Sequence, residues 1–273
     1  MKFFKTLIGA VLVAGSAIAM LAPAAAHARS LEEVVASKKL VVGINPNFPP
    51  LGIYNEKNEI DGFDVDVARK LAEMLGVELE IVPVGSPDRI PFVMSGKIDA
   101  VMGAMTRTDE RAKVIDFTIP VHTEVLGVLT TKGKGYKDWN ELNSSDVKMV
   151  EVRGATPVKL VQEQLPKAQL LLLDNYPDAV RALAQGRADA MIDVLDFMRE
   201  HTEKHKNVDW EFMKTPIDVY YCGLGIKKGN TTLAGKLNEL VKQLHANGYI
   251  DQRWEKWFGG PMLHDPRQSP YYK

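Results

Sequence analysis

Short apolar runs alternate with amphipathic segments along the first half of the chain. The apolar runs predict buried strands at 40–44, 78–82 and 98–102. The segments between them predict helices at 65–75 and 90–95, and a further helix begins near Asp109. Strands separated by helices favour a mostly parallel sheet with helices on its faces, so we expect an α/β fold.

The second half repeats this organisation. Strands are predicted at 147–152, 170–173 and 188–192, and a helix at 177–185. A further helix starts after Gly154, with Thr156 suited to the N-cap and Pro157 to the first helical position. The two halves also share a short motif, Gly-basic-apolar-Asp-Ala, in which Asp99 and Asp189 stand 189 − 99 = 90 positions apart. Two similar lobes are therefore expected.

The last predicted elements have no half-domain of their own to complete. They are a strand at 223–226 and helices at 233–247 and 250–258. We expect them to return to the first lobe, so that two crossings, near 121–126 and 216–220, join the lobes in a way that suits hinge closure. The predicted division is lobe 1 at 29–123 plus 219–262, lobe 2 at 124–218, and an irregular, proline-containing C-terminal tail at 263–273.

The N-terminus has the pattern of a secretory signal peptide. A short cationic start is followed by an apolar stretch at 7–21 and by Ala26-His27-Ala28, so residues 1–28 are predicted to be cleaved off after Ala28. The apolar stretch falls short of the ~20 residues that a membrane-spanning helix needs. No cysteine lies near the cleavage site. We therefore expect a protein that is free in the periplasm and not lipid-anchored.

Composition and charge exclude several classes of protein. The 273 residues are 45% hydrophobic and 25% charged, as in ordinary globular proteins. The formal net charge is −1, and removal of Lys2 and Lys5 leaves 34 − 2 = 32 basic against 35 acidic residues, a charge near −3. No basic run with interleaved aromatic residues is present, so nucleic acid is not an expected partner.

Neither metal chemistry nor thiol chemistry is indicated. Asp64-x-Asp66 lacks the remaining ligand positions of a calcium loop, and the six histidines have no metal-binding spacing. We therefore expect no metal and no cofactor. Cys222 is the only cysteine and lies in an apolar run, so we expect a buried thiol and no internal disulfide.

The segment 103–111 is the strongest candidate for a binding site. It follows the predicted strand at 98–102, carries the hydroxyl of Thr106, and ends in a helix start with Arg111 in its first turn. Open N–H groups at a helix N-terminus attract anions, and a guanidinium beside them can hold a carboxylate through two hydrogen bonds. We expect this segment to bind the carboxylate of a small ligand.

Taken together, these segments resemble those of the periplasmic amino-acid-binding proteins of ABC importers, bacterial solute-binding protein family 3. The similar segments cover most of the chain from 40 to 259, and they are 42–50, 62–66, 96–99, 106–111 with 116–117, 154–156, 186–193, 227–230 and 254–259. The resemblance implies a periplasmic-binding-protein-like fold of type II, with two similar lobes of mostly parallel sheet joined by two hinge crossings.

The resemblance also implies ligand contacts for the amino-acid backbone. Arg111 matches the arginine that pairs with the α-carboxylate. Thr106 matches a hydroxyl donor to the same group, and Thr156 a second donor from the other lobe. Asp193 matches the acid that accepts hydrogen bonds from the α-ammonium. A zwitterion would thus meet a cation at one end and an anion at the other.

Other matching positions concern the ligand side chain. Phe48 falls where an aromatic ring packs on it, and Arg89 could meet a side-chain carboxylate. Ala104 replaces a frequent serine, so its contact would come from the backbone alone. Asn45 stands where binders of basic amino acids often carry Asp. A polar or acidic ligand is therefore expected rather than a basic one.

The predicted function is delivery of an amino acid to an ABC permease in the inner membrane by a monomeric binding protein that is not an enzyme. Two alternatives stay open. A periplasmic enzyme on this fold, such as a cyclohexadienyl dehydratase, would need a general acid, for which Glu124, Asp88 and Asp196 are candidates. A ligand sensor for a membrane receptor would use the same closure.

Overall fold

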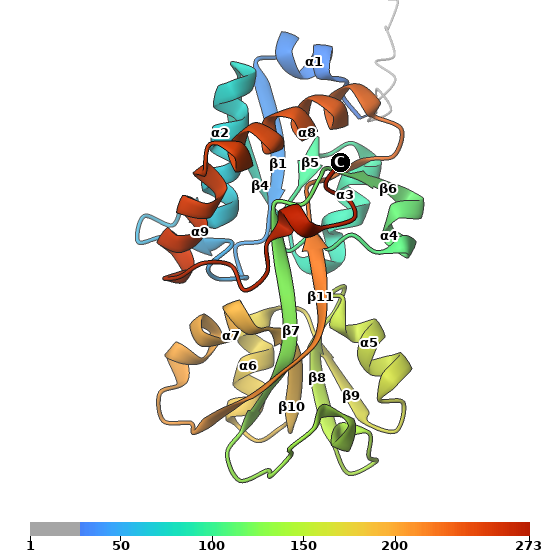
Figure 1. Cartoon of the computed structure of the whole chain (residues 1–273), viewed down its shortest axis with the longest axis vertical. Helices are drawn as coiled ribbons and strands as arrows, with labels where there is room; N and C mark the ends of the chain where they lie inside the picture. Colours follow the sequence, from blue (N-terminus) through green and yellow to red (C-terminus); the bar gives the residue numbers. More distant parts are fainter. Residues whose placement is uncertain (1–27) are drawn as a thin grey trace, which may run out of the picture.

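The computed structural model describes residues 28–273, so the predicted leader at 1–28 lies almost entirely outside the described residues. Two five-stranded sheets form two lobes, one above the other in Figure 1. None of the helices in the described part of the chain is long and apolar enough to cross a membrane. The type II arrangement predicted from the sequence is confirmed.

Lobe 1 contains a sheet with the strand order β4-β1-β5-β12-β6. Its strands are β1 (Lys39–Ile44), β4 (Glu78–Pro83), β5 (Ala100–Val101), β6 (Ile115–Phe117) and β12 (Gly225–Lys227). Its helices are α1 (Leu31–Ala36), α2 (Phe63–Leu75), α3 (Arg89–Ser95), α4 (Asp109–Val114), α8 (Thr231–Ala246) and α9 (Tyr249–Phe258). A hairpin of β2 (Ile53–Tyr54) and β3 (Ile60–Asp61) stands beside them. β1 is parallel to both of its neighbours, whereas β12 is antiparallel to β5 and β6.

Lobe 2 contains a sheet with the strand order β11-β7-β10-β8-β9. Its strands are β7 (His122–Thr131), β8 (Lys148–Val152), β9 (Gln169–Leu173), β10 (Ala190–Val194) and β11 (Trp210–Cys222), and its helices are α5 (Pro157–Gln164), α6 (Tyr176–Ala184) and α7 (Leu195–Thr202). β8 runs parallel to β9 and β10, and β7 runs antiparallel to β10 and β11.

β7 and β11 are the two segments that connect the lobes, and they lie side by side in Figure 1. Thr123 pairs with Tyr221 and Glu124 with Tyr220, and the register then shifts between Met213 and Asp218. The two crossings predicted near 121–126 and 216–220 are in fact long paired strands. The expected strand at 98–102 is shorter than predicted, since only Ala100–Val101 pairs as β5.

The repeated motif has the same structural task in both lobes. The carboxylate of Asp99 accepts a hydrogen bond from the amide of Val41 at 2.7 Å, and the Asp99 amide donates to the Val41 carbonyl at 2.9 Å. The carboxylate of Asp189 accepts from the amide of Lys148 at 2.8 Å, and its own amide donates to the Lys148 carbonyl at 2.7 Å. Asp99 therefore ties the start of β5 to β1, and Asp189 ties the start of β10 to β8. β5 and β10 are the central strands of their sheets.

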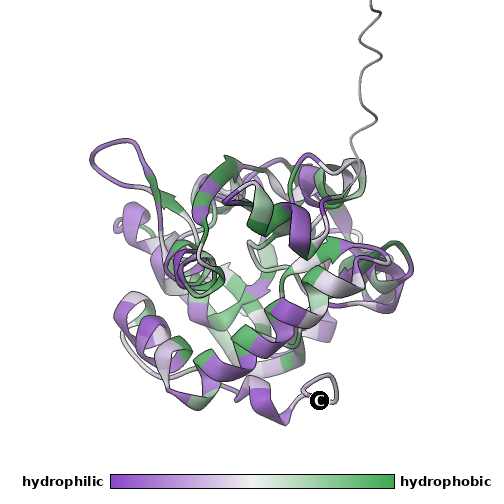
Figure 2. Ribbon diagram, turned by 90° about the horizontal axis from the view of Figure 1, so that it is seen from above, coloured by the Kyte–Doolittle hydropathy of each residue, from purple (hydrophilic) through white to green (hydrophobic). Residues whose placement is uncertain are grey.

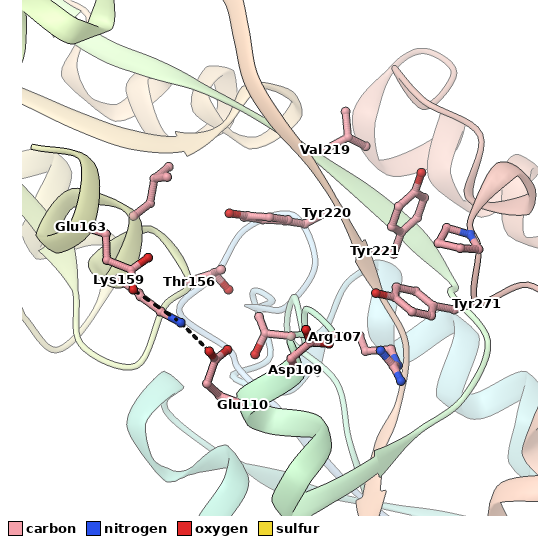
Figure 3. A pocket seen from close by; sticks show the side chains of 13 residues that line it. Arg107, Asp109, Glu110, Thr156, Lys159, Glu163, Val219, Tyr220, Tyr221 and Tyr271 are labelled. Carbon is pink, nitrogen blue, oxygen red and sulfur yellow. Dashed lines mark hydrogen bonds and ion pairs between the residues drawn. The ribbon is translucent and has the colours of Figure 1, made fainter.

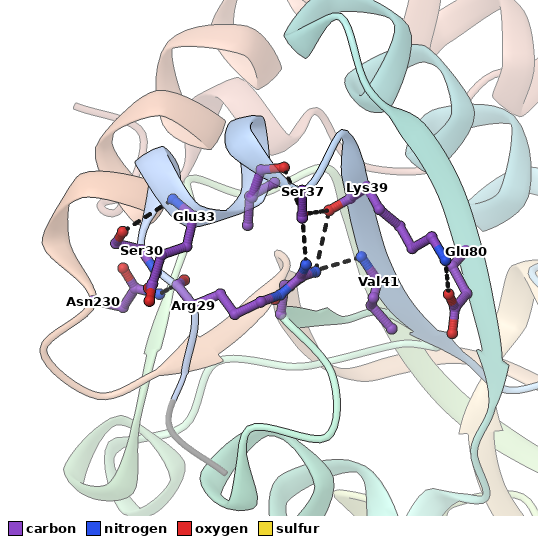
Figure 4. A network of polar contacts seen from close by, with 10 residues as sticks. Arg29, Ser30, Glu33, Ser37, Lys39, Val41, Glu80 and Asn230 are labelled. Atoms are coloured by element: carbon purple, nitrogen blue, oxygen red, sulfur yellow. Dashed lines mark hydrogen bonds and ion pairs between the residues drawn. The ribbon is translucent and has the colours of Figure 1, made fainter. Parts of the chain in front are cut away.

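A cation that is distant in the sequence forms an ion pair with each of these two aspartates. Arg29 reaches Asp99 through Nε at 2.9 Å and donates to the Ser37 hydroxyl and the Lys39 carbonyl (Figure 4). Lys134 forms the corresponding ion pair with Asp189 in lobe 2. Arg29, the residue after the predicted cleavage point, is thus tied into lobe 1.

Amphipathic helices enclose both sheets. On α2 the residues that face the sheet, Val67, Ala68 and Leu71, are fully buried, and Gly76 ends the helix in the left-handed conformation at φ 71°. Burial of one Leu or Val side chain contributes ~1.5–3 kcal/mol. Figure 2 shows the same arrangement from above, with hydrophilic positions mostly on the outer faces of the helices.

Candidate functional site

The predicted binding segment follows β5 as a tight turn between the lobes. Gly103 has φ 85° and Ala104 φ 55°, a left-handed conformation that is uncommon for alanine. The turn is held from below by Asp64 at the start of α2, whose carboxylate accepts a hydrogen bond from the Gly103 amide at 2.7 Å. Since strained backbone conformations cluster at binding sites, this turn is consistent with the expected role of the segment.

Thr106 and Arg111 lie in direct contact. Thr108 caps α4 by accepting a hydrogen bond from the Arg111 amide at 3.2 Å. The Arg111 guanidinium folds back and donates through Nη1 to the Thr106 carbonyl at 2.9 Å. Its Nη2 donates across the lobe boundary to the carbonyl of Gly154, also at 2.9 Å.

Arg89 lies beside Arg111 at the Gly154 carbonyl and is almost completely buried. Its Nε donates to the Ser86 carbonyl at 3.1 Å, and its Nη1 donates to the carbonyls of Gly103 and Ala104. Its Nη2 reaches the Gly154 carbonyl at 3.2 Å. The guanidinium hydrogen bonds of Arg89 and Arg111 described here therefore all end on backbone carbonyl oxygens. Burial lowers the pKa of both guanidinium groups, and that of Arg111 falls to about 10.

Gly154 is the contact point of lobe 2 on this side. Its φ is +78°, and a Cβ atom at this position would lie 2.9 Å from the Pro87 Cα and 2.9 Å from the Ser86 carbonyl oxygen. Real Cβ atoms do not approach backbone so closely, so the observed contact between the lobes requires glycine here. From the sequence, Gly154 is predicted only to precede a helix and to belong to a matching segment, and neither feature indicates this contact.

Thr156 does not cap its helix through its side chain. It stands at the N-cap position of α5, but it has helical φ and ψ angles of −63° and −38° and its side chain makes no capping hydrogen bond. Its hydroxyl donates instead to the Thr106 hydroxyl of lobe 1 at 3.0 Å. The predicted N-cap position of Thr156 is therefore confirmed, but its hydroxyl does not cap the helix, because the side chain is engaged across the lobe boundary. An ion pair between Glu110 of α4 and Lys159 of α5 lies nearby (Figure 3).

Phe48 lies in an aromatic group built from both lobes. Its ring stacks on Tyr176 with the centroids 3.8 Å apart and an interplanar angle of 12°. Phe197 meets the same ring edge-on at 5.0 Å. Phe48 comes from the loop after β1, whereas Tyr176 begins α6 and Phe197 lies in α7. No sequence pattern marks Tyr176 as a site residue, since an aromatic residue at a helix start is usually structural.

Asn45 and Asp193 complete the predicted set. The Asn45 amide donates to the Ser86 hydroxyl at 3.2 Å and its oxygen accepts from the Asn47 amide at 3.0 Å. Asp193 is buried near the end of β10, where its carboxylate accepts from the Val194 amide at 2.8 Å. Burial raises the pKa of both Glu124 and Tyr176, and the nearby Asp193 carboxylate adds to both shifts, so Asp193 belongs to the same buried group of residues.

Several buried carboxyl groups surround this site. Burial raises the pKa of Asp64, Glu124 and Asp196 to about 7 each. Glu124 lies at the hinge, and its carboxyl group accepts a hydrogen bond from the Thr106 hydroxyl at 2.7 Å. Asp88, the third acid considered from the sequence, is exposed. Within residues 28–273 no group of three or more His, Cys, Asp or Glu side chains could hold a metal ion.

Two cavities lie beside this buried group, not inside it. One of about 410 Å³ separates the binding segment from α5, and Thr156, Lys159, Tyr220 and Tyr271 are among the residues that line it (Figure 3). A second of about 240 Å³ is lined by Arg111, Gly154 and Thr156. Phe48, Arg89 and Asp193 line neither cavity, because the two lobes are in contact around them.

Known proteins with a similar sequence or structure share this architecture. The glutamine-binding protein GlnH of an ABC transporter from Bacillus subtilis is 30% identical over 84% of this chain and 84% of its own. The arginine-binding protein 1 of an Escherichia coli ABC transporter is 27% identical over 82% of this chain and 92% of its own. An ancestral amino-acid-binding protein described as a precursor of cyclohexadienyl dehydratase superposes with a TM-score of 0.78 at 32% identity, over 84% of this chain and 99% of that one.

The sequence profile of one family covers most of the chain. Residues 40–260 match the bacterial extracellular solute-binding proteins, family 3. Together with these relatives and the two-lobed fold, this match shows that the chain belongs to family 3 of the bacterial extracellular solute-binding proteins.

Proposed function

We propose that this protein captures a polar or acidic amino acid between its two lobes and delivers it to the permease of an ABC importer. The observation that carries this proposal is the convergence of the Arg89 and Arg111 guanidinium groups on a single oxygen, the carbonyl of Gly154. Two cations directed at one acceptor, one of them buried (Arg89) and one partly buried (Arg111), favour an anion, and a carboxylate accepts such hydrogen bonds more strongly than a neutral carbonyl.

The remaining contacts suit the backbone of an amino acid. The hydroxyls of Thr106 and Thr156 meet at 3.0 Å from opposite lobes. A carboxylate held by Arg111 would take the place of their present acceptors, Glu124 for Thr106 and Thr106 for Thr156, and would then accept from both hydroxyls. Asp193 would accept hydrogen bonds from the ammonium group. Charge-assisted hydrogen bonds contribute ~1.5–3 kcal/mol each. Several of them cover the ~8 kcal/mol of a micromolar affinity after the costs of association and closure.

The ligand side chain is proposed to be polar or acidic rather than basic. Arg89 is a buried cation at the inner end of the site, and the nearby Asn45 is neutral and has its amide group engaged by Ser86 and Asn47. A cationic ligand side chain would face Arg89 without a compensating acid at position 45. Among the relatives, the glutamine-binding protein agrees with this assignment and the arginine-binding protein does not.

The place of action follows from the leader and the family. A cleaved signal peptide would release the protein into the periplasm, where a monomer with closed lobes would dock on an inner-membrane permease. The family of extracellular solute-binding proteins agrees with this location. A fusion of residues 1–28 to a reporter that is active only outside the cytoplasm tests the leader directly.

A thermal-shift screen of the mature protein tests the ligand class. Ligands that bind only the folded state raise the melting temperature by mass action. We expect stabilisation by at least one polar or acidic amino acid and none by arginine, lysine or polyamines. Stabilisation by arginine alone would overturn the ligand class, and no response to any amino acid would overturn the function.

Glu124 supports a second candidate function, a dehydratase. Its carboxyl group is buried between the lobes, it bonds to Thr106, and its pKa of about 7 suits a general acid at neutral pH. The structural relative described as a precursor of cyclohexadienyl dehydratase adds to this reading. Turnover of prephenate or arogenate by the wild-type protein that is lost in Glu124→Gln would establish it.

A further inference from the structure

The C-terminal tail, residues 263–273, crosses the lobe-1 end of both hinge strands (Figure 1). The carbonyl of His264 accepts a hydrogen bond from the Thr123 hydroxyl of β7 at 2.7 Å. The Nε2 atom of the same histidine lies 3.3 Å from the Tyr221 hydroxyl of β11. Thr123 and Tyr221 are direct register partners in the hinge ladder. One tail residue therefore holds a matched pair of residues, one on each hinge strand.

The tail itself is anchored on helices of lobe 1. Arg267 donates to Asp251 of α9 at 3.1 Å, and its Nε donates to Asp265 at 2.8 Å. The Tyr272 ring meets His245 of α8 edge-on, with the ring centroids 5.4 Å apart. Both anchors follow His264, and the chain before it continues from the end of α9 at Phe258. His264 therefore belongs to a strap that is tied to lobe 1 on both sides and is not a loose end.

The strap also reaches the binding segment. The Arg107 guanidinium lies over the Tyr271 ring at 4.0 Å, and the Tyr271 ring packs edge-on against Tyr221 at 6.2 Å. The Arg107 amide donates to the Tyr221 carbonyl at 2.9 Å. Arg107 directly follows Thr106, so the position of the Thr106 hydroxyl depends on a residue that the tail supports. Tyr271 also lines the 410 Å³ cavity opposite Lys159 of lobe 2 (Figure 3).

We propose that the tail is a hinge strap, in which His264 and Tyr271 are positioning residues for the ligand site. His264 fixes the lobe-1 root of both hinge strands, so bending is confined to the part beyond the Thr123–Tyr221 pair, towards the register shift between Met213 and Asp218. Tyr271 holds Arg107, and through it the carboxylate-binding segment. The effect on ligand affinity rests on the proposed function, whereas the effect on the hinge does not.

Binding measurements test the contribution of Tyr271. A cation–π contact of ~0.5–1 kcal/mol corresponds to a two- to fivefold change in Kd. Tyr271→Ala should weaken the best ligand from the screen by about that factor, whereas Tyr271→Phe keeps the ring and should match the wild type. Leu263→Ala is the control, because this exposed tail residue has a large apolar side chain away from the contacts described above. Wild-type affinity in Tyr271→Ala, or equal weakening in Tyr271→Phe, would overturn this role.

Hydrogen exchange tests the hinge contact without any ligand. The double variant Thr123→Val, Tyr221→Phe removes the two hydroxyls that face His264 and leaves the side-chain shapes nearly unchanged. We expect several-fold faster amide exchange around 121–124 and 220–222, since a typical hydrogen bond stabilises by ~1 kcal/mol. Thr130→Val is the matched control, because its hydroxyl bonds to the Asp189 carbonyl at 2.7 Å on the same strand, away from the tail.

The two arms separate the two hypotheses. If no amino acid binds the wild type, the proposed function fails and the exchange experiment alone decides on the strap. Unchanged hinge exchange in the double variant would overturn the strap, even if the wild type binds an amino acid tightly. Faster exchange at the hinge in Thr130→Val as well would also overturn it, because the effect would then not depend on the tail.

Discussion

Arg89 and Arg111 donate to the same oxygen atom, the carbonyl of Gly154, at 3.2 and 2.9 Å. Both arginines belong to lobe 1 and the oxygen to lobe 2, so the two side chains meet where the lobes touch. Like charges at this distance repel, and Arg89 contributes to the lowered pKa of Arg111 after the larger effect of burial. An anion between them would relieve this repulsion, which gives the proposed carboxylate site its physical basis.

Removal of Arg111 should abolish binding of every amino acid that the wild type accepts. Loss of one member of a buried charge pair costs ~2–5 kcal/mol, so Arg111→Ala should raise Kd at least about 30-fold. Arg187→Ala, at an exposed position of lobe 2, is the control and should bind normally. Calorimetry that gives near-wild-type affinity for Arg111→Ala would remove this residue from the site.

Arg89 should affect selectivity more than general binding. Arg89→Gln keeps a donor for the surrounding carbonyl oxygens but removes the charge, so it should weaken glutamate or aspartate more than glutamine or asparagine. We expect a difference of about tenfold, which is ~1.4 kcal/mol. Competition measurements with matched pairs of amino acids provide the test. Equal weakening of both classes would mean that Arg89 does not contact the ligand side chain.

Gly154→Ala should prevent the close contact of the lobes. The new Cβ would meet Pro87 and Ser86 at 2.9 Å, so ligand affinity should fall strongly, by an amount that calorimetry measures. Gly186→Ala is a matched control, because Gly186 has a similar φ of +67° in lobe 2 and no atom lies within 4 Å of its Cβ position. Both variants should lose ~1 kcal/mol of stability from the left-handed backbone, but only Gly154→Ala should lose binding.

The Glu124 carboxyl group should make stability depend on pH. Its pKa is raised from 4.5 to about 7. The folded protein therefore binds the proton more tightly than the unfolded chain does. Its stabilising contribution is fully present below pH 4.5 and is lost as the pH rises through about 7. The shift corresponds to on the order of 3 kcal/mol.

Glu124→Gln should remove this term. We expect the difference in unfolding free energy between wild type and variant to change steadily from pH 5 to pH 8, in favour of the variant at high pH. Burial lowers the pKa of His122 to about 4, so this residue has the opposite effect: the protein loses stability as the pH falls below 6.5. It is present in both proteins and cancels in the comparison. A difference that stays constant with pH would show that Glu124 does not titrate in this range.

The aromatic contact between the lobes should contribute to ligand affinity. Phe48→Ala removes the ring that stacks on Tyr176, and a stacked pair contributes ~0.5–1.5 kcal/mol beyond its buried area. We expect binding at least about threefold weaker by calorimetry. Tyr54→Ala is the control, because this aromatic residue of lobe 1 is 48% exposed. Unchanged affinity in Phe48→Ala would separate the aromatic group from ligand binding.

Much of the fold is predictable from the sequence because most elements have a regular pattern. The helix over Phe63–Leu75, for example, has a clear apolar face and a glycine stop. β7 was not recognised, because nearly all of its residues are buried and it therefore shows no alternation of apolar and polar positions. The repeated Asp99 and Asp189 indicated two similar lobes. In the structure both aspartates form hydrogen bonds with the backbone of a neighbouring strand.

The position of the segment 103–111 between a strand end and a helix start was also predictable, and its role in binding stays a prediction. Contacts between the lobes were not predictable. The role of Gly154 depends on its close approach to Pro87 in the other lobe, and the role of Tyr176 depends on its stacking on Phe48. No local pattern in the sequence encodes either relationship. The hydroxyl of Thr156 likewise reaches Thr106 because the lobes meet, whereas local propensity alone predicted a helix cap.

Calorimetric titration of the mature wild-type protein with glutamate, glutamine and arginine, at one pH and one salt concentration, tests the central claim most directly. The two converging arginines predict micromolar or tighter binding of glutamate or glutamine and no measurable binding of arginine. Arginine as the tightest ligand, or no heat of binding from any of the three amino acids, would contradict the account.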